Sequence, residues 1–449
     1  MVKPKVGLFG ILEKSEEGWE RASQQVRLIK DQLEKAGMQV FAHQEVVGDD
    51  KSAQTAGRFF RDSDPDLLLA YMITWSFDHL VLSVLRYIDR PVAILAIPGI
   101  KTGSLVGAQQ LGYLLTEQNK QYSAFFGPTD IPDTYGPILS FAKAASVKRR
   151  MEMGKIMQIG RRCHGMSPAS FDELEITRLF GPQVVTFSWE EIERNAESMK
   201  KSNVKEIQDK IKSIDPMTEC AETDIEYTAR IYLTLKSMYR ESDLIAISLG
   251  GYPQYAGKVC LVSSLLGEEG IVSGCCEGDM NSMLAMYLLQ EFSGQPTHFG
   301  EMLDVDEDEN SVVTSHCGCS APKLAADPSQ IRIAPVRLFN QGTCIKFPAK
   351  SGPATYANLV GRRGTYRICA IEGHAEVTDM VFEGNPVKMV FNVPIKEVIK
   401  TVFEKGFGHH WIMGYAHMIQ DLNNFCRISG LEGTFLQPNQ GIKYASFHQ

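Results

Sequence analysis

The chain has 449 residues, of which 46 are basic and 54 acidic, giving a formal net charge of −8, and 44% of its residues are hydrophobic. This length is more than one hydrophobic core usually organises, so two or three globular domains are expected. The charge balance lacks the excess of lysine and arginine that nucleic-acid-binding proteins carry, so a nucleic-acid partner is not expected.

The first 130 residues alternate between strand and helix signals. Continuous apolar segments bounded by polar residues predict strands, and apolar side chains three and four residues apart predict helices. The predicted strands are residues 6–12, 38–47, 66–74, 91–97 and 122–126, and the predicted helices are residues 19–36, 53–61, 77–88 and 107–117. Such strands indicate a parallel sheet covered on both faces, which binds ligands at the carboxyl ends of its strands.

A helix over residues 144–153 leads into a second alternating unit. Its predicted strands are residues 155–159, 183–188 and 243–248, and its predicted helices are residues 172–180, 189–201 and 223–242. From about residue 330, short strands separated by Gly, Pro and Asn indicate a mostly antiparallel module. These strands are residues 331–339, 341–348, 356–362, 364–373 and 389–393, followed by helices over 395–404 and 412–428.

These patterns together predict an α/β fold. Two tandem doubly wound parallel-sheet domains, residues 1–142 and 143–329, precede a β-rich C-terminal domain with terminal helices, residues 330–449. No Gly-x-Gly-x-x-Gly follows the first strand and no Gly-x4-Gly-Lys-Ser/Thr occurs, which disfavours dinucleotide and nucleoside-triphosphate chemistry.

Neither a membrane span nor an export signal is evident in the sequence. No apolar run reaches the roughly 18 residues that cross a bilayer, so we expect a cytoplasmic protein without a membrane partner. All ten cysteines follow residue 160 and are best interpreted as reduced core thiols. Cys275, Cys276, Cys317 and Cys319 are a weak zinc candidate because they form no Cys-x-x-Cys pair.

Glu277 is the first candidate site residue. It lies between an apolar run over residues 270–276 and a helical pattern over residues 280–292, at the junction of a strand end and a helix start. Free backbone N–H groups and the helix dipole stabilise a carboxylate at such a position. The alternative is that Asp279 caps the helix and Glu277 takes no part in a site.

Further candidates follow this helix. Glu301 comes after a Gly-Gln-Pro turn and can reach the same sheet edge as the first carboxylate, or it belongs to the acidic loop over residues 304–309. His316 ends the next apolar stretch, where a lone histidine is also common as a structural residue. The pair at residues 409–410 lies in a Gly-rich loop before a predicted helix, and adjacent side chains point in different directions. Two carboxylates with one or two imidazoles suit Mn²⁺ and related ions.

Three stretches resemble a known enzyme family. Residues 277–301, with Glu-Gly-Asp-x-Asn and a later Phe-x-Glu, resemble the metal-binding region of L-fucose isomerase and L-arabinose isomerase. Residues 410–422, His-x4-Tyr-x-His-x3-Asp-Leu, resemble the segment of L-fucose isomerase that carries its metal-binding histidine. Residues 71–76 are similar to a Trp-Met-His-Thr-Phe-Ser segment of arabinose isomerases, except that Ile73 replaces the histidine. Glu301 stands where fucose isomerases have aspartate.

The resemblance implies a metal-dependent enzyme that interconverts an aldose and a ketose. A divalent ion would be held by Glu277, Glu301 and His410, and His316 stands roughly where L-arabinose isomerase has a further histidine ligand. The ion would bind O1 and O2 of an open-chain sugar and stabilise an enediolate. Glu277 and Glu301 would also move the proton between C1 and C2.

The resemblance also implies a homo-oligomer, because family members are trimers or hexamers whose active site lies at a subunit interface. Trp75 and the loop over residues 101–104, with Lys101 and Ser104, would then approach the metal of a neighbouring subunit as substrate-binding residues. Asp279 is a further candidate for substrate binding.

Several cations raise the question of an anionic substrate. Arg362 and Arg363 lie on a predicted turn, with Arg367 and Lys323 elsewhere in the C-terminal half. They are either ordinary surface charge or contacts to an anionic sugar such as sulfoquinovose. Two other functions stay open at this point, a non-catalytic sugar-binding protein and a metal-dependent lyase acting through the same enediolate.

Overall fold

The computed structural model describes residues 3–274, 276–438 and 442–445. The chain divides into two compact units: unit 1 comprises Met1–Arg150 with Gln420–Ser429, and unit 2 comprises Met151–Ile419 with Gly430–Gln449. The predicted fold class is confirmed, because two parallel sheets with helices are followed by a mixed, β-rich sheet and further helices. The three predicted domain ranges stay predictions.

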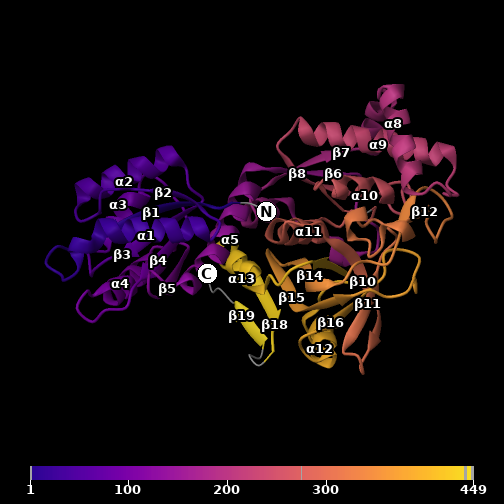
Figure 1. Cartoon of the computed structure of the whole chain (residues 1–449). Helices are drawn as coiled ribbons and strands as arrows, with labels where there is room; N and C mark the ends of the chain where they lie inside the picture. Colours follow the sequence, from indigo (N-terminus) through magenta and orange to yellow (C-terminus); the bar gives the residue numbers. More distant parts are fainter. Residues whose placement is uncertain (1–2, 275, 439–441, 446–449) are drawn as a thin grey trace. The chain divides into compact units, whose positions relative to one another are not determined.

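Unit 1 is built on a five-stranded parallel sheet of order β2-β1-β3-β4-β5 (Figure 1). Its strands are β1 (Lys5–Ile11), β2 (Gln39–Ala42), β3 (Leu67–Met72), β4 (Val92–Ala96) and β5 (Tyr122–Phe126). Its helices are α1 (Ala22–Lys35), α2 (Asp50–Ser63), α3 (His79–Leu85), α4 (Ser104–Glu117) and α5 (Tyr135–Met153). Every residue of β3 and β4 is buried, as expected for strands covered on both faces.

A helix from the C-terminal part of the sequence completes unit 1. This helix, α13 (Ile419–Ser429), contributes the buried side chains Leu422 and Phe425. The hydroxyl of Ser140 on α5 donates a hydrogen bond of 2.5 Å to Asp421. Unit 1 is therefore not a contiguous segment of the chain.

Unit 2 contains a four-stranded parallel sheet of order β7-β6-β8-β9. Its strands are β6 (Lys155–Ile159), β7 (Gln183–Phe187), β8 (Leu244–Leu249) and β9 (Val272–Ser273). The helices between them are α6 (Glu173–Leu179), α7 (Trp189–Glu197), α8 (Lys201–Ile214), α9 (Glu222–Arg240) and α10 (Cys260–Glu268). The carboxyl ends of these strands form one edge of the candidate site.

The second sheet of unit 2 closes on itself. Its order is β14-β17-β10-β11-β16-β15-β18-β19, and an additional pairing of β14 with β15 joins the first six strands into an antiparallel ring. The strands are β10 (His298–Asp306), β11 (Ser311–Ser315), β14 (Gly352–Arg362), β15 (Thr365–Glu376), β16 (Val387–Phe391), β17 (His410–Gly414), β18 (Glu432–Leu436) and β19 (Ile442–Ala445). A separate pair, β12 (Arg332–Ala334) and β13 (Cys344–Lys346), and helix α12 (Ile395–Lys405) accompany it.

The ring differs from the prediction at two places. The helix predicted over residues 412–428 is wrong in its first part, because residues 410–414 form β17 and α13 begins only at Ile419. β17 pairs with β10 on one side and β14 on the other, and this long-range pairing decides between strand and helix where an apolar run alone does not. β10 and β11, which precede residue 330, also belong to the ring.

Helix α11 (Met280–Ser293) joins the two sheets of unit 2. It contacts β8 and β9 of the parallel sheet as well as β14 and β17 of the ring, and it lies between them in Figure 1. Eleven of its residues are buried, including Met283, Leu284 and Leu288. The helix therefore fixes the distance between the carboxyl ends of the parallel strands and the outer face of the ring.

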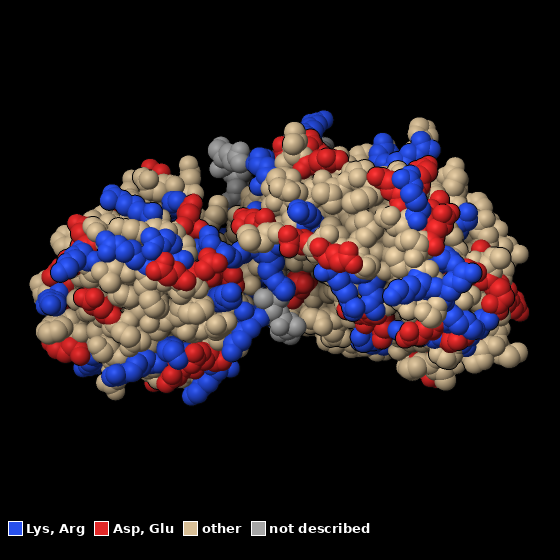
Figure 2. All heavy atoms as spheres, turned by 90° about the horizontal axis from the view of Figure 1, so that it is seen from above, with Lys and Arg blue, Asp and Glu red and all other residues tan. Residues whose placement is uncertain are grey.

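On the face drawn in Figure 2, acidic and basic side chains are intermingled over both units. No helix among the described residues is long and apolar enough to cross a membrane. The described cysteines are buried, except that Cys317 is partly exposed.

The position of α13 generates a prediction about fragments. A fragment of residues 1–150 exposes the apolar surface that α13 covers, and losing the burial of its apolar side chains costs on the order of 5 kcal/mol, which is comparable to the stability of a whole domain. We therefore expect this fragment to lack a cooperative thermal unfolding transition by circular dichroism. The same fragment joined through a flexible linker to residues 419–429 should regain one, and equal behaviour of the two would contradict this account.

Candidate metal centre

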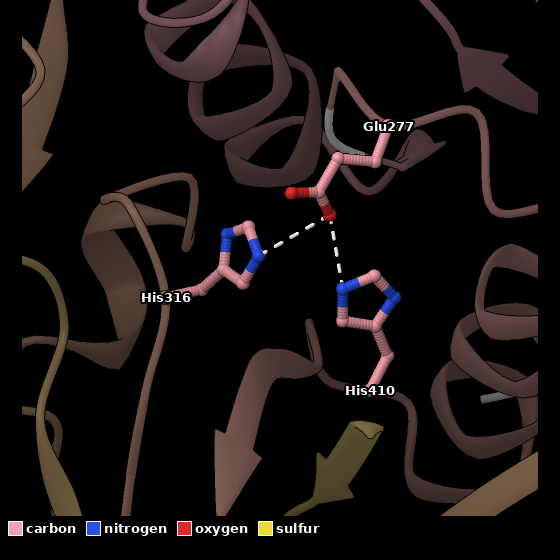
Figure 3. Close-up of side chains that lie close together, drawn as sticks. All are labelled: Glu277, His316 and His410. Atoms are coloured by element: carbon pink, nitrogen blue, oxygen red, sulfur yellow. Dashed lines mark ion pairs between the residues drawn. The ribbon is translucent and has the colours of Figure 1, made fainter. Parts of the chain in front are cut away.

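Three buried side chains converge in unit 2 (Figure 3). His410 Nε2 lies 2.9 Å and His316 Nε2 lies 3.4 Å from the same carboxylate oxygen, Oε2 of Glu277. The ligand atoms of all three lie within 4.8 Å of one another. This group is called the triad below.

The triad is assembled from both sheets of unit 2. Glu277 lies in the loop between β9 and α11, His316 directly follows β11, and His410 is the first residue of β17. β10 lies between β11 and β17, so that Glu301 is opposite His410 on one side and Ser315 on the other. The expectation that the two carboxylates reach one sheet edge is wrong, because Glu301 belongs to the ring and Glu277 to the parallel sheet.

Glu301 and His409 lie on the solvent side of the triad. The Glu301 side chain is 35% exposed and that of His409 40%, whereas His410 is 1% exposed. Glu301 Oε1 lies 3.9 Å from His410 Nε2 and 3.9 Å from His409 Nε2, so these residues form a second group of converging ligand atoms that shares His410 with the triad. An accessible carboxylate therefore stands next to a buried one.

Asp279 orients His410. Its Oδ2 accepts a hydrogen bond of 2.8 Å from His410 Nδ1 and one of 2.6 Å from the Ser282 hydroxyl, and its Oδ1 accepts the backbone N–H groups of Asn281 and Ser282 at the start of α11. The carboxylate thus caps the helix and fixes the imidazole at once. A proton held on Nδ1 leaves the lone pair on Nε2, the nitrogen that faces Glu277.

The triad fits a divalent cation. His410 Nε2 makes no hydrogen bond to any described residue, although it lies 2.9 Å from Glu277 Oε2, so this contact has the distance but not the geometry of a hydrogen bond. Burying a polar nitrogen without a partner is unfavourable, and a shared cation would satisfy both atoms. One carboxylate and two imidazoles suit a divalent transition ion such as Mn²⁺ or Zn²⁺.

Charge within the triad shifts two pKa values in opposite directions. Burial alone would lower the pKa of His410, but the hydrogen bond to Asp279 and the negative charges of Asp279 and Glu277 outweigh it and raise the pKa to about 9. Burial alone would raise the pKa of Glu277, but His316 and His410 hold it well below its usual range. Glu277 is therefore a carboxylate at neutral pH, which is the form that binds a cation.

Phe299 packs against both imidazoles. Its ring centroid lies 4.8 Å from that of His316 in an edge-on contact and 4.9 Å from that of His410. Phe299 is two residues before Glu301 on β10 and therefore on the same face of the strand. This ring restricts both imidazoles and excludes water from one side of the triad.

Comparison with known proteins connects this geometry to a family. Residues 297–432 match the L-arabinose isomerase C-terminal domain. The predicted resemblance is confirmed, and the chain is distantly homologous to sulfoquinovose isomerases. The matched range contains Glu301, His316 and His410, and Glu277 precedes it.

Two relatives indicate the extent of this homology. A sulfoquinovose isomerase from Alkalicoccus urumqiensis is 23% identical over 383 residues, covering 82% of this chain and 86% of that protein. One from Priestia aryabhattai is 22% identical over 380 residues, covering 82% and 84%. Among solved structures, an ABC sugar transporter subunit from Rhodobacter sphaeroides 2.4.1 aligns at 8% identity over 58% of this chain and 81% of that chain, with a TM-score of 0.17 that carries no conclusion about the fold.

Three of the predicted substrate-binding residues, Trp75, Lys101 and Ser104, belong to unit 1, whereas the triad belongs to unit 2. Ser104 accepts a hydrogen bond from Ile97 N–H and donates one to the Met72 carbonyl, which ties the ends of β3 and β4 together. Trp75 N–H donates to the Thr102 carbonyl in the same loop region. Lys101 is exposed, with its Nζ 3.4 Å from Glu17. Their role in substrate binding stays a prediction.

Among the described side chains, the predicted arginine Arg363 lines a pocket that contains no member of the triad. Arg363 lies at the turn between β14 and β15 and lines a pocket of about 320 Å³ with residues of α6 and β15. Asn358 marks the part of β14 that lies beside His410, because its side chain donates a hydrogen bond to the His410 carbonyl. The turn is four to five residues further along the strand, a distance of roughly 13–16 Å. The side chain of Arg362 lies outside the described part of the structure. Arg367 donates to the Lys405 carbonyl, and Lys323 to that of Glu268.

Sequence reasoning missed two supporting elements. The sequence does not indicate that Asp279 orients His410, because an aspartate directly before a helix is expected to cap it whether or not it also bonds a histidine. The loop over residues 160–166 was also missed, although two arginines after a glycine at the end of a predicted strand were a usable signal. The groups of converging ligand atoms among the described residues contain no cysteine, and Cys275 lies outside those residues.

Replacing Asp279 by Asn tests its positioning role. Asn retains the helix cap but gives His410 only a neutral acceptor, so we expect D279N to weaken Mn²⁺ binding by about 10- to 100-fold with little change in thermal stability. The measurement is calorimetric titration of Mn²⁺ into EDTA-treated protein. Asp172, which caps α6 in the same way, provides the matched control D172N. Equal affinities of the two variants would contradict the assignment.

The raised pKa of His410 predicts that metal affinity depends on pH. Below about pH 9 the metal-free imidazole carries a proton that must leave before Nε2 binds a cation. Affinity for Mn²⁺ should therefore rise by up to about tenfold per pH unit between pH 6 and pH 8 and then level off above pH 9. Titrations in buffers of different ionisation enthalpy should count one proton released near pH 7, and a pH-independent affinity would be inconsistent with His410 as a ligand.

Proposed function

We propose that this protein is a metal-dependent aldose–ketose isomerase that acts on an open-chain sugar. The observation that carries the proposal is the convergence of Glu277, His316 and His410 beside the accessible Glu301, in a chain whose residues 297–432 match an L-arabinose isomerase domain. The homology to sulfoquinovose isomerases over 82% of the chain supports the same reaction class.

The triad would hold the cation, with Glu301 as a fourth ligand on the solvent side. When bound, a divalent cation supplies Lewis-acid polarisation of neighbouring sugar oxygens and balances the negative charge that develops on them. Asp279 keeps the His410 ring in the orientation that presents Nε2, and Phe299 keeps water away from one face. Glu277 would supply the buried negative charge of the ligand set.

Glu301 and Glu277 are the proposed acid–base residues. Isomerisation removes the proton from C2 of the aldose and delivers one to C1, while a proton passes from O2 to O1, so that atoms and charge balance over the reaction. Glu301 is suited to the carbon-bound proton, because its side chain is partly exposed and lies next to the triad. Glu277, buried and held as a carboxylate, is suited to orient the cation and to accept the hydroxyl proton.

The proposed substrate is an anionic hexose of the sulfoquinovose type. The two relatives described above carry that substrate in their names, and their alignment covers most of both chains. We propose Mn²⁺ as the cation, because carboxylate oxygens contribute to the ligand set along with the imidazoles.

We also propose a homo-oligomer, a trimer or hexamer, whose active site includes unit 1 of a neighbouring subunit. The support is an exposed apolar surface at the carboxyl edge of the unit 1 sheet, formed by Phe77, Ile100, Leu105 and Val106. Such a surface beside Trp75, Lys101 and Ser104 suits contact with another protein surface.

The deciding experiment is an isomerisation assay on EDTA-treated protein with and without added Mn²⁺. Sulfoquinovose, glucose 6-phosphate, glucose, L-fucose and L-arabinose are incubated in D₂O, and ketose formation and deuterium incorporation are followed by NMR. We expect Mn²⁺-dependent conversion, fastest with sulfoquinovose, and a loss of about 10²- to 10⁴-fold in kcat for E301Q. Cleavage to shorter products would point to a lyase, and no conversion of any sugar by metal-loaded protein would refute the proposal.

A further inference from the structure

A loop that follows β6 carries two arginines and is hydrogen-bonded to the loop that carries Glu277. Residues 160–166 lie at the carboxyl end of the parallel sheet and include Arg161 and Arg162, both exposed. The backbone N–H of Cys163 donates a hydrogen bond of 2.8 Å to the carbonyl of Glu277. The loop that carries these two guanidinium groups is thus bonded directly to the loop that carries a proposed metal ligand.

Close packing between backbones fixes the positions of the main-chain atoms of Arg161 and Arg162. A Cβ atom on Gly278 would lie 2.8 Å from the Cα of Arg162, and one on Gly250 would lie 2.2 Å from the carbonyl oxygen of Arg161. Gly278 also has a φ of +67°, which a side chain disfavours. The loop therefore rests against the ends of β8 and β9 with no side chain between, and its position is set by the sheet.

The structure shows no acidic partner for the two arginines among the residues that it describes. In the part of the chain that the structure describes, neither Arg161 nor Arg162 forms an ion pair, and Arg162 Nη1 donates only to carbonyls of its own loop, at 3.2 Å to Cys163 and 3.4 Å to Met166. In contrast, Arg178 nearby in the sequence is paired with Glu175. Two uncompensated guanidinium groups at the ligand-binding edge of a parallel sheet suit an anionic group of a ligand.

We propose that Arg161 and Arg162 bind the anionic group at the far end of the sugar substrate. This inference rests on the proposed isomerase function and deepens it by naming the residues that select an anionic sugar. Five bonds separate Cα from Cζ in arginine, and five separate C1 from C6 in a hexose. An arginine that starts beside Gly278 therefore has the length to meet a C6 substituent of a sugar whose C1 end lies at Glu277.

A sulfonate or phosphate group matches this arrangement. Both present several oxygens in a compact group, and the planar guanidinium donates two parallel N–H bonds to such a pair of oxygens. Two adjacent arginines supply two positive charges where a neutral sugar would require none. A neutral aldose bound at the same site would gain no binding energy from these two charges.

The test compares sulfoquinovose with quinovose, which has a methyl group in place of the sulfonate. For R161Q and R162Q, kcat/KM for sulfoquinovose should fall about 10- to 100-fold through KM, while kcat/KM for quinovose stays within about twofold. R162K, which keeps the charge and loses the planar fork, should be intermediate. R194Q provides the control, because Arg194 is an exposed arginine on α7 without an ion pair to any described residue.

A binding measurement makes the test independent of turnover. Calorimetric titration of sulfoquinovose into EDTA-treated protein should give a dissociation constant that rises about 10- to 100-fold in R161Q and R162Q and is unchanged in R194Q. Thermal unfolding checks that each variant is folded. R363Q, measured alongside, decides between this loop and the arginine predicted at the turn between β14 and β15.

The outcomes separate the two proposals. The arginine assignment would be overturned if the wild-type protein isomerised both sugars equally. It would also be overturned if the variants kept the preference for sulfoquinovose. Either result would leave the isomerase function intact. Binding of sulfoquinovose that depends on the arginines, in a protein that converts no sugar, would support the assignment and refute the isomerase function. Equal losses on both sugars would show that the loop acts only structurally, and would also overturn the assignment.

Discussion

The hydrogen bond between Asp279 and His410 connects the two sheets of unit 2 at the candidate metal centre. One oxygen of the Asp279 carboxylate accepts the first N–H groups of α11, and the other accepts the imidazole at the start of β17. The start of the helix and the orientation of the ring are therefore a single arrangement. A displacement of α11 along the ring would break the helix cap and misdirect His410 together.

Hydrogen bonds of the main chain extend this constraint to the neighbouring loops. Gly278 N–H donates to the last residue of β8 at 2.7 Å, and the Glu277 carbonyl accepts from Cys163. Three loops at the carboxyl ends of parallel strands are thus bonded to one another, while the ring supplies His316, His410 and Glu301 from the opposite side. Polar atoms converge in this unit because two sheets that have no strand in common both pack against α11.

The sequence predicts those features that depend on local pattern. The strands at residues 122–126 and 155–159 are confirmed to the residue, because each is a short, mostly apolar segment that ends just before a glycine. β17 was mistaken for helix, because its strand conformation depends on pairing with β10 and β14, far away in the sequence. Glu277, His316 and His410 could be suggested as a ligand set from their residue types and their positions at the ends of predicted elements, and the family resemblance supported that grouping, since no spacing rule relates residues 39 and 94 positions apart. The proximity of Arg162 to Gly278 is tertiary and leaves no trace in either local stretch.

The placement of α13 has a consequence for recombination between related sequences. The chain completes β17 in unit 2, contributes α13 to unit 1, and returns to unit 2 as β18. A chimaera with a single crossover near residue 150 would combine the first 150 residues of one parent with the α13 of the other. Leu422 and Phe425 would then pack against core side chains from a different parent. Exchange of unit 1 as an intact module requires crossovers at three places in the gene, and single-crossover libraries would be depleted of stable members as parental divergence increases.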